Sequence, residues 1–110
     1  MTNETDGRIA RTESLFRNVN ERIAESAARF GAEETTFVCE YADPACADRV
    51  DASLDTYEQV RKDGATFLIA EGHDVDEVEA VVKQRRGYAV VEKVKPAVRE
   101  IVKRLNPRTA

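Results

Sequence analysis

Hydrophobic and polar positions alternate at helical spacing over residues 8–30. Apolar side chains recur there every three or four residues, at Phe16, Val19, Ile23, Ala27 and Phe30. This spacing predicts one apolar stripe along a helix. Gly31 follows, and glycine readily takes the backbone conformation that ends a helix. We expect the stripe to pack on a core, although a stripe of this kind can also bind a partner.

Two strand-like segments come next, joined by a turn. Residues 35–41 are rich in β-branched and aromatic side chains, and residues 49–53 alternate between polar and apolar positions. Asp43-Pro44 breaks the first segment and predicts a turn. The two segments therefore predict a pair of neighbouring strands.

A short helix and a buried strand follow. Ser53 is placed to cap a helix over residues 54–62, because its side-chain oxygen can accept a hydrogen bond from an amide of the first turn. The apolar run over residues 66–70 predicts a buried strand. Residues 71–74 then predict a loop.

The last third of the chain predicts a hairpin and a helix. Residues 88–94 are strongly strand-like and follow a turn signal, so a hairpin over residues 77–94 is the economical interpretation. The competing interpretation is a helix over residues 75–86 that lies on the sheet. Pro96 fits the first turn of a final helix. The apolar face of that helix comprises Val98, Ile101, Val102 and Leu105, and Asn106-Pro107 ends it.

The elements together predict an α+β fold. We expect one domain over residues 1–110, with residues 1–7 and 107–110 frayed. The predicted order is α-β-β-α-β-β-β-α: an antiparallel sheet of about five strands, with a long N-terminal helix, a short middle helix and a C-terminal helix. The helices are expected on one face of the sheet or at its ends.

The net charge of −4 is unevenly distributed. Residues 37–92 hold 6 basic and 13 acidic groups, whereas residues 93–110 hold 6 basic and 1 acidic. An acidic body argues against nucleic-acid binding. No apolar run approaches the roughly 18 residues of a membrane span. The polar, acidic N-terminus does not read as a secretory signal, so the sequence predicts a cytoplasmic protein.

Cys39, Cys46 and His73 form the candidate site. A tight turn centred on Ala42-Asp43 would pair position 39 with position 46 across a hairpin, where Cβ atoms lie about 4.5–5.5 Å apart. The two sulfurs would then be close enough to share a metal or to form a disulfide. His73 is the one histidine of the chain. It follows an apolar strand and could reach the same place.

Six segments carry a resemblance over roughly residues 12–108. They are Phe16-Arg17-x-Val19-Asn20-Glu21-Arg22-Ile23, Phe37-Val38-Cys39-Glu40, Asp43-Pro44-x-Cys46, Tyr57-Glu58-x-Val60-Arg61, Gly72-His73 and Val90-Val91-Glu92-Lys93. Together they resemble a group of small uncharacterised actinobacterial proteins. Members carry Cys-x-Cys-x4-Cys and a later Gly-His, which implies a tetrahedral zinc site. Cys39, Cys46 and His73 match that pattern, but Tyr41 stands where the middle cysteine would be.

Four interpretations of these three residues stay open. The first is a buried thiol pair with a solvated histidine. The second is a weakened zinc site, completed by Asp43, Glu40 or water. The third is a reversible disulfide, and the fourth is Cys–His nucleophilic catalysis. The acidic surroundings disfavour the last two, because they raise the pKa of a thiol.

The sequence therefore predicts a non-catalytic interaction or accessory module with a degenerate Cys/His metal site. A structural zinc-binding module is the first alternative, and a thiol redox or Cys–His enzyme is the second. No Gly-rich phosphate loop, His-Glu-x-x-His motif or serine elbow is present in the chain. The predicted cofactor is none or zinc. The predicted partner is an unidentified protein, with a homodimer left open and neither nucleic acid nor membrane expected.

Overall fold

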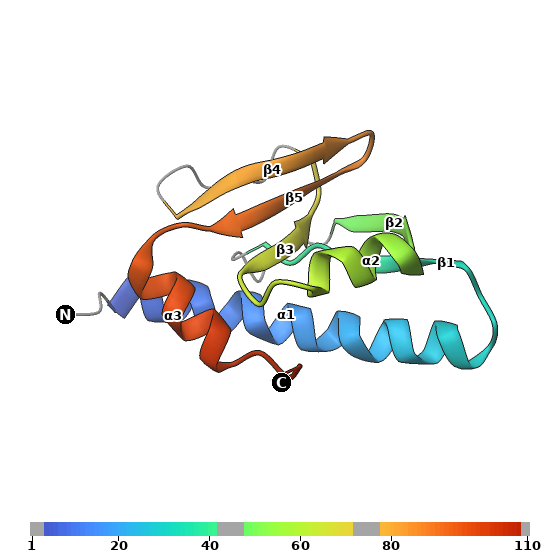
Figure 1. Cartoon of the computed structure of the whole chain (residues 1–110), viewed down its shortest axis with the longest axis horizontal. Coiled ribbons are helices and arrows are strands. Elements are labelled where there is room, and N and C mark those ends of the chain that lie inside the picture. The colour runs from blue at the N-terminus through green and yellow to red at the C-terminus, as the bar shows by residue number, and fades with distance from the viewer. Residues whose placement is uncertain (1–3, 42–47, 72–77, 109–110) are drawn as a thin grey trace.

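A computed structural model describes residues 4–41, 48–71 and 78–108. Within these ranges the chain forms three helices and five strands in an α+β arrangement (Figure 1). The elements are α1 (Glu4–Arg29), β1 (Glu34–Val38), β2 (Arg49–Ser53), α2 (Leu54–Arg61), β3 (Thr66–Ile69), β4 (Glu79–Arg85), β5 (Tyr88–Lys93) and α3 (Pro96–Arg104). This order of helices and strands is the one that the sequence predicts.

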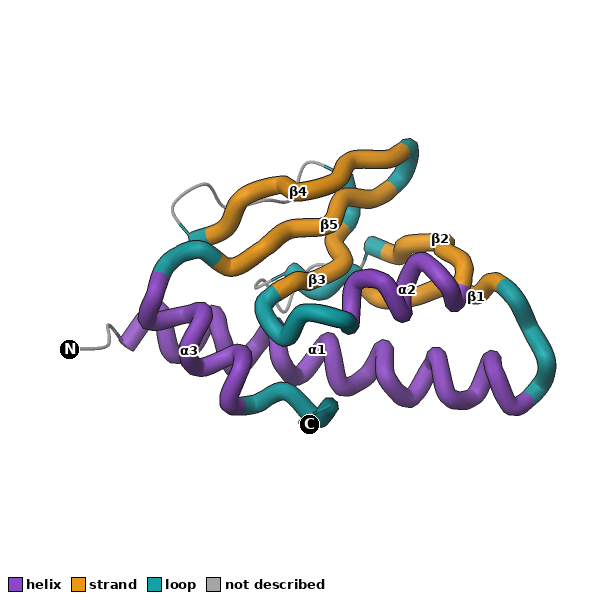
Figure 2. Tube along the Cα trace, viewed as in Figure 1, coloured by secondary structure: helices purple, strands orange, loops and turns teal. Residues whose placement is uncertain are grey.

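The five strands form two antiparallel sheets, so the prediction of one five-stranded sheet is wrong. β1 pairs with β2, and the second sheet has the order β3-β5-β4. Figure 2 shows the β4–β5 hairpin on the side of the molecule away from α1. The hairpin over residues 77–94 is confirmed, and the competing helix over residues 75–86 is not formed in its described part, residues 78–86.

Side chains, rather than a continuous backbone ladder, join the two sheets. The backbone N–H of Glu40, two residues past the end of β1, donates to the Leu68 carbonyl of β3 at 2.9 Å. The Leu68 N–H donates in return to the Glu40 carboxylate at 2.8 Å. The Ala70 N–H donates to Cys39 Sγ at 3.1 Å. The acceptors are thus side chains, at positions where a regular strand would present backbone carbonyls. The backbone hydrogen bonding between the two sheets is therefore interrupted here.

The helices lie around this arrangement as their local signals predict. α1 runs along one side of the molecule, and α3 packs against it (Figure 1). The Ser53 side chain caps α2 by accepting from the Thr56 N–H at 3.0 Å, as predicted. Pro96 occupies the first turn of α3, and Val98, Ile101 and Val102 are buried there. Leu105, predicted in the same apolar face, is exposed.

Most of the predicted apolar stripe of α1 lies outside its core face. Ile23 is half-buried and packs against the core as predicted. Phe16 and Ala27 are half-buried, and Val19 and Phe30 are exposed. The side chains that α1 buries are mostly polar or small, at Asp6, Ala10, Glu13, Ser14, Arg17, Asn20 and Ala24. Their spacing of three and four residues is also helical. The prediction failed because charged side chains of α1, which have buried partners, form the face that packs on the core.

Two regions predicted to be frayed make contacts. α1 begins at Glu4, and buried Asp6 pairs with Lys95 Nζ at 2.9 Å. Near the C-terminus, Arg108 pairs with Glu21 at 2.8 Å and with Glu58 at 2.7 Å. These ion pairs connect both ends of the chain to the body.

Candidate functional site

Cys39 is the one residue of the predicted Cys/His site that the structure describes. It is buried, and its sulfur accepts the Ala70 N–H directly after β3. Cys46 and His73 lie outside the described residues, so their distances to Cys39 are not defined here. Within the described ranges, no three His, Cys, Asp or Glu side chains are grouped to hold a metal ion.

The register of β1 and β2 differs from the predicted one. Val38 lies opposite Arg49, and the Cys39 N–H donates to the Asp48 carbonyl at 3.3 Å. Asp48 therefore occupies the position opposite Cys39, and the predicted pairing of 39 with 46 has the wrong register. The predicted turn centred on Ala42-Asp43 lies outside the described residues.

Glu40 and Asn20 form the polar junction between α1 and the two sheets. Asn20 Nδ2 donates to the Val38 carbonyl and to Glu40, each at 2.8 Å, and its oxygen accepts the Val38 N–H at 2.9 Å. Burial raises the pKa of the fully buried Glu40 to about 7, although hydrogen bonds from Leu68 and Asn20 act to lower it. The junction holds β1 against α1 and β3.

A second polar group surrounds Phe67. Arg17 donates to the Gly64 and Val102 carbonyls, each at 2.8 Å. Lys93 pairs with Glu13 at 2.6 Å and also with Glu79. The Arg17 and Lys93 cations lie 4.7 and 5.0 Å from the centre of the Phe67 ring.

Burial decides what this charged group can do. The charged members of the two polar groups are each at most 3% exposed: Glu13, Arg17, Glu40, Glu79 and Lys93. Burial raises the pKa of Glu13 to about 7 against the opposing effect of Lys93, and it lowers that of Arg17 to about 10. Perturbed pKa values often mark catalytic groups. Groups this deep cannot meet a substrate, however, so the arrangement serves the fold.

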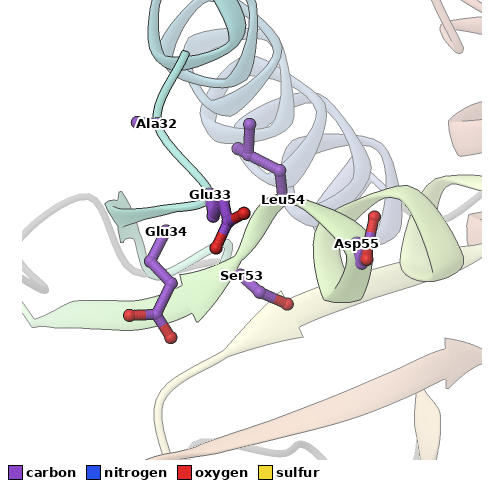
Figure 3. Close-up of a pocket in the computed structure, with 6 residues that line it drawn as sticks. All are labelled: Ala32, Glu33, Glu34, Ser53, Leu54 and Asp55. Atoms are coloured by element: carbon purple, nitrogen blue, oxygen red, sulfur yellow. The ribbon is translucent and has the colours of Figure 1, made fainter.

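An open hollow of about 700 Å³ lies where β1 begins and α2 starts (Figure 3). It is lined by Ala32, Glu33, Glu34, Ser53, Leu54 and Asp55. Its carboxylates are exposed, and they point in different directions in Figure 3. The hollow is a solvated acidic surface rather than a built ligand site.

The most distinctive surface feature is an apolar strip on the outside of α1. We define the α1 strip as Leu15, Phe16, Val19, Ile23 and Phe30. Leu15 is 60% exposed, Val19 40% and Phe30 84%, while Phe16 and Ile23 are half-buried. At 3.6 residues per turn these five side chains fall along one side of the helix. In Figure 1, α1 lies along one edge of the molecule, with the sheets on one side of it.

A row of arginines borders the α1 strip. Arg8, Arg11, Arg22 and Arg29 are all exposed and fall beside Leu15 on the helix. None of these four makes an ion pair with another residue that the structure describes. Glu25 is the one exposed carboxylate among residues 5–29. The bordering surface is therefore strongly basic, although the whole chain is acidic.

Sequence reasoning found the residues of this strip but assigned most of them to the core. One signal could have corrected the assignment. Asp6, Glu13, Arg17 and Asn20 share a second helical face with the small residues Ala10 and Ala24. Small residues allow close helix packing, and polar groups of both signs can pair when buried.

Comparison with known protein families, with curated proteins and with solved structures finds no match for this chain. The resemblance to actinobacterial proteins therefore stays a prediction. Among the described helices, none combines the length and apolar character that crossing a membrane requires.

Proposed function

We propose that this protein is a cytoplasmic, non-catalytic interaction module that binds another protein through the α1 strip. One observation supports the proposal above all. Leu15, Val19 and Phe30 are exposed along one side of α1, next to half-buried Phe16 and to Ile23, which also packs against the core. Single exposed apolar residues are ordinary, whereas a contiguous exposed patch is typical of an interaction site.

The energetic argument concerns what the free protein leaves unburied. Fully burying a Leu, Val or Phe side chain contributes about 1.5–3 kcal/mol. Leu15, Val19 and Phe30 make only part of this contribution in the free chain, since they are 60%, 40% and 84% exposed. When a partner covers the α1 strip, the free energy of burying these side chains would stabilise the complex.

Site-specific photo-cross-linking tests the proposal. A photoreactive amino acid at position 19 should capture a defined protein in the cells that express this chain. The matched control is position 84, where Gln84 is exposed on β4. Val19→Asp should abolish capture from a neighbouring probe at position 15. The same change should alter the free energy of unfolding by no more than about 0.5 kcal/mol, because surface changes are usually this small. Equal capture from positions 19 and 84, or capture from neither, would reject the strip as a binding site.

A structural zinc-binding module is the second candidate, and the position of Cys39 favours it. Its sulfur lies at the end of β3, the strand that precedes His73 in the sequence. Thiolate and imidazole are zinc ligands, but a closed structural site needs four. Cys39, Cys46 and His73 would supply three of them.

We predict that the purified, tag-free protein contains well below one zinc per chain. Elemental analysis measures the zinc content directly. One zinc per chain that is lost on Cys39→Ser would show instead that the zinc-binding function is correct. Cys39→Ala separates loss of ligation from loss of the Ala70 hydrogen bond, because both variants remove the thiolate but only serine retains an oxygen acceptor.

A further inference from the structure

The apolar residues of α1 are spaced for a second helix. Ile9, Phe16, Ile23 and Phe30 follow one another at steps of seven. Positions seven apart drift slowly around a straight helix, and a second helix that coils around the first can follow them. From Ile9 to Phe30 the helix rises about 30 Å, at about 1.5 Å per residue. Ile9 and Ile23 are half-buried and also pack against the core of this chain. A partner helix of about three heptads would therefore cover the exposed parts of these four side chains, of which Phe30 is the most exposed.

The arginines beside the α1 strip indicate which charges the partner helix should carry. Positions beside an apolar seam meet the flanking positions of the partner, where charges set partner choice and orientation. On this chain the exposed flank carries Arg8, Arg11, Arg22 and Arg29, without ion pairs among the described residues. Four cations without a described ion pair outnumber the one exposed carboxylate beside them, Glu25, so carboxylates on the partner would match this flank.

A second copy of this chain fits the seam poorly. An antiparallel copy would set Ile9 opposite Phe30 and Phe16 opposite Ile23, which matches apolar with apolar. The same alignment brings Arg8 close to Arg29 of the second copy, and like charges at such positions are destabilising. A parallel alignment would set the arginine side opposite the side of Glu13 and Asn20, which is buried against the body and cannot meet a second copy.

We infer that the occupant of the α1 strip is a helix of another protein, with apolar side chains in heptads and Asp or Glu at the flanking positions. This inference rests on the proposed function, since it names the partner class of the same surface. An anionic lipid surface would also attract arginine and apolar side chains. A lipid surface does not require the seven-residue register that α1 shows.

Two designed peptides of three heptads test the inference. Both carry Leu at the first and fourth positions of each heptad; one carries Glu and the other Lys at the flanking positions. Fluorescence anisotropy should show the full-length protein binding the Glu peptide at least tenfold more tightly, a difference of about 1.4 kcal/mol. The preference should weaken with added salt, because exposed charges are screened.

A charge reversal supplies the decisive control. The double variant Arg22→Glu and Arg29→Glu should reverse the preference, so that the Lys peptide binds more tightly. The matched control is Lys103→Glu with Arg104→Glu, which makes the same change in net charge on exposed positions of α3. That variant should keep the preference for the Glu peptide.

Three outcomes would overturn the inference. The first is equal binding of the two peptides, or binding of neither. The second is a dimer at micromolar concentration in sedimentation that Val19→Asp dissociates, since a second copy would then cover the strip. The third is binding to phosphatidylserine vesicles that Val19→Asp removes, without a peptide preference. Cross-linking from position 19 to a protein would still support the proposed function in the first case, so the two failures are distinguishable.

Discussion

At the scale of single residues, buried polar side chains make contacts that backbone or apolar groups make in most small domains. Asn20 pairs with both backbone groups of Val38, as a neighbouring strand would. Glu40 accepts the Leu68 N–H where a strand carbonyl would stand. A buried polar group is costly unless its partners are present, and here most have them.

Glu40 gives this arrangement a pH dependence. Burial raises its pKa to about 7, against hydrogen bonds that lower it, and the ordinary value for glutamate is about 4.3. Between those values the folded chain binds more protons than the unfolded chain, so its free energy of unfolding falls as pH rises. In Glu40→Gln this contribution is absent. Wild type should therefore lose stability relative to Glu40→Gln from about pH 5 to about pH 7.5, by on the order of 2 kcal/mol.

Urea unfolding at several pH values measures this difference. Burial raises the pKa of Glu13 in the same direction, to about 7, and the charge of Glu40 is the smallest contribution to that shift, so the effect of Glu13 differs little between the two proteins. Glu34→Gln, at an exposed position of β1, supplies the baseline. A difference between wild type and Glu40→Gln that stays constant over this pH range would show that burial does not hold a proton on Glu40.

At the scale of elements, local sequence signals were sufficient to predict most boundaries of the helices and strands. The Ser53 cap, Pro96 in the first turn of α3 and the turn before β5 each act through neighbouring residues. Gly87 takes a φ of 89°, a conformation that favours glycine, and it joins β4 to β5. Such signals can be recognised in a sequence because their partners lie within a few positions.

Contacts between distant residues could not be predicted in this way. Arg17 acquires its partners from Gly64 and Val102, which lie 47 and 85 positions away. Without those contacts, hydrophobic periodicity favours Phe16 and Val19 as the core face of α1. The break between the two sheets depends likewise on Glu40 meeting Leu68, 28 positions away. The candidate Cys/His site depends on Cys46 and His73, which lie outside the described residues.

At the scale of the whole molecule, the C-terminal segment ties two helices together. Asn106 accepts from Arg61, the last residue of α2. Arg108 pairs with Glu21 of α1 and Glu58 of α2, and its guanidinium lies 5.9 Å from the centre of the Tyr57 ring. A segment without secondary structure thus connects α1 and α2 beyond the end of α3.

These ion pairs are expected to make a measurable contribution to the free energy of unfolding. Arg108→Ala should lower the free energy of unfolding by about 1 kcal/mol, since each exposed ion pair contributes about 0.2–1 kcal/mol. Burial acts to raise the pKa of Glu21, but hydrogen bonds from Arg108 and Arg61 lower it overall; a hydrogen bond from Arg108 also lowers that of Glu58. A lowered pKa in the folded state means that the stabilisation is present at neutral pH and is lost as pH falls. The effect of Arg108→Ala should therefore fade below about pH 4 and in high salt.

Arg104→Ala, at an exposed position with no described ion pair, is the control. An equal loss in both variants would mean that general charge, and not the contacts of Arg108, stabilises this end of the molecule.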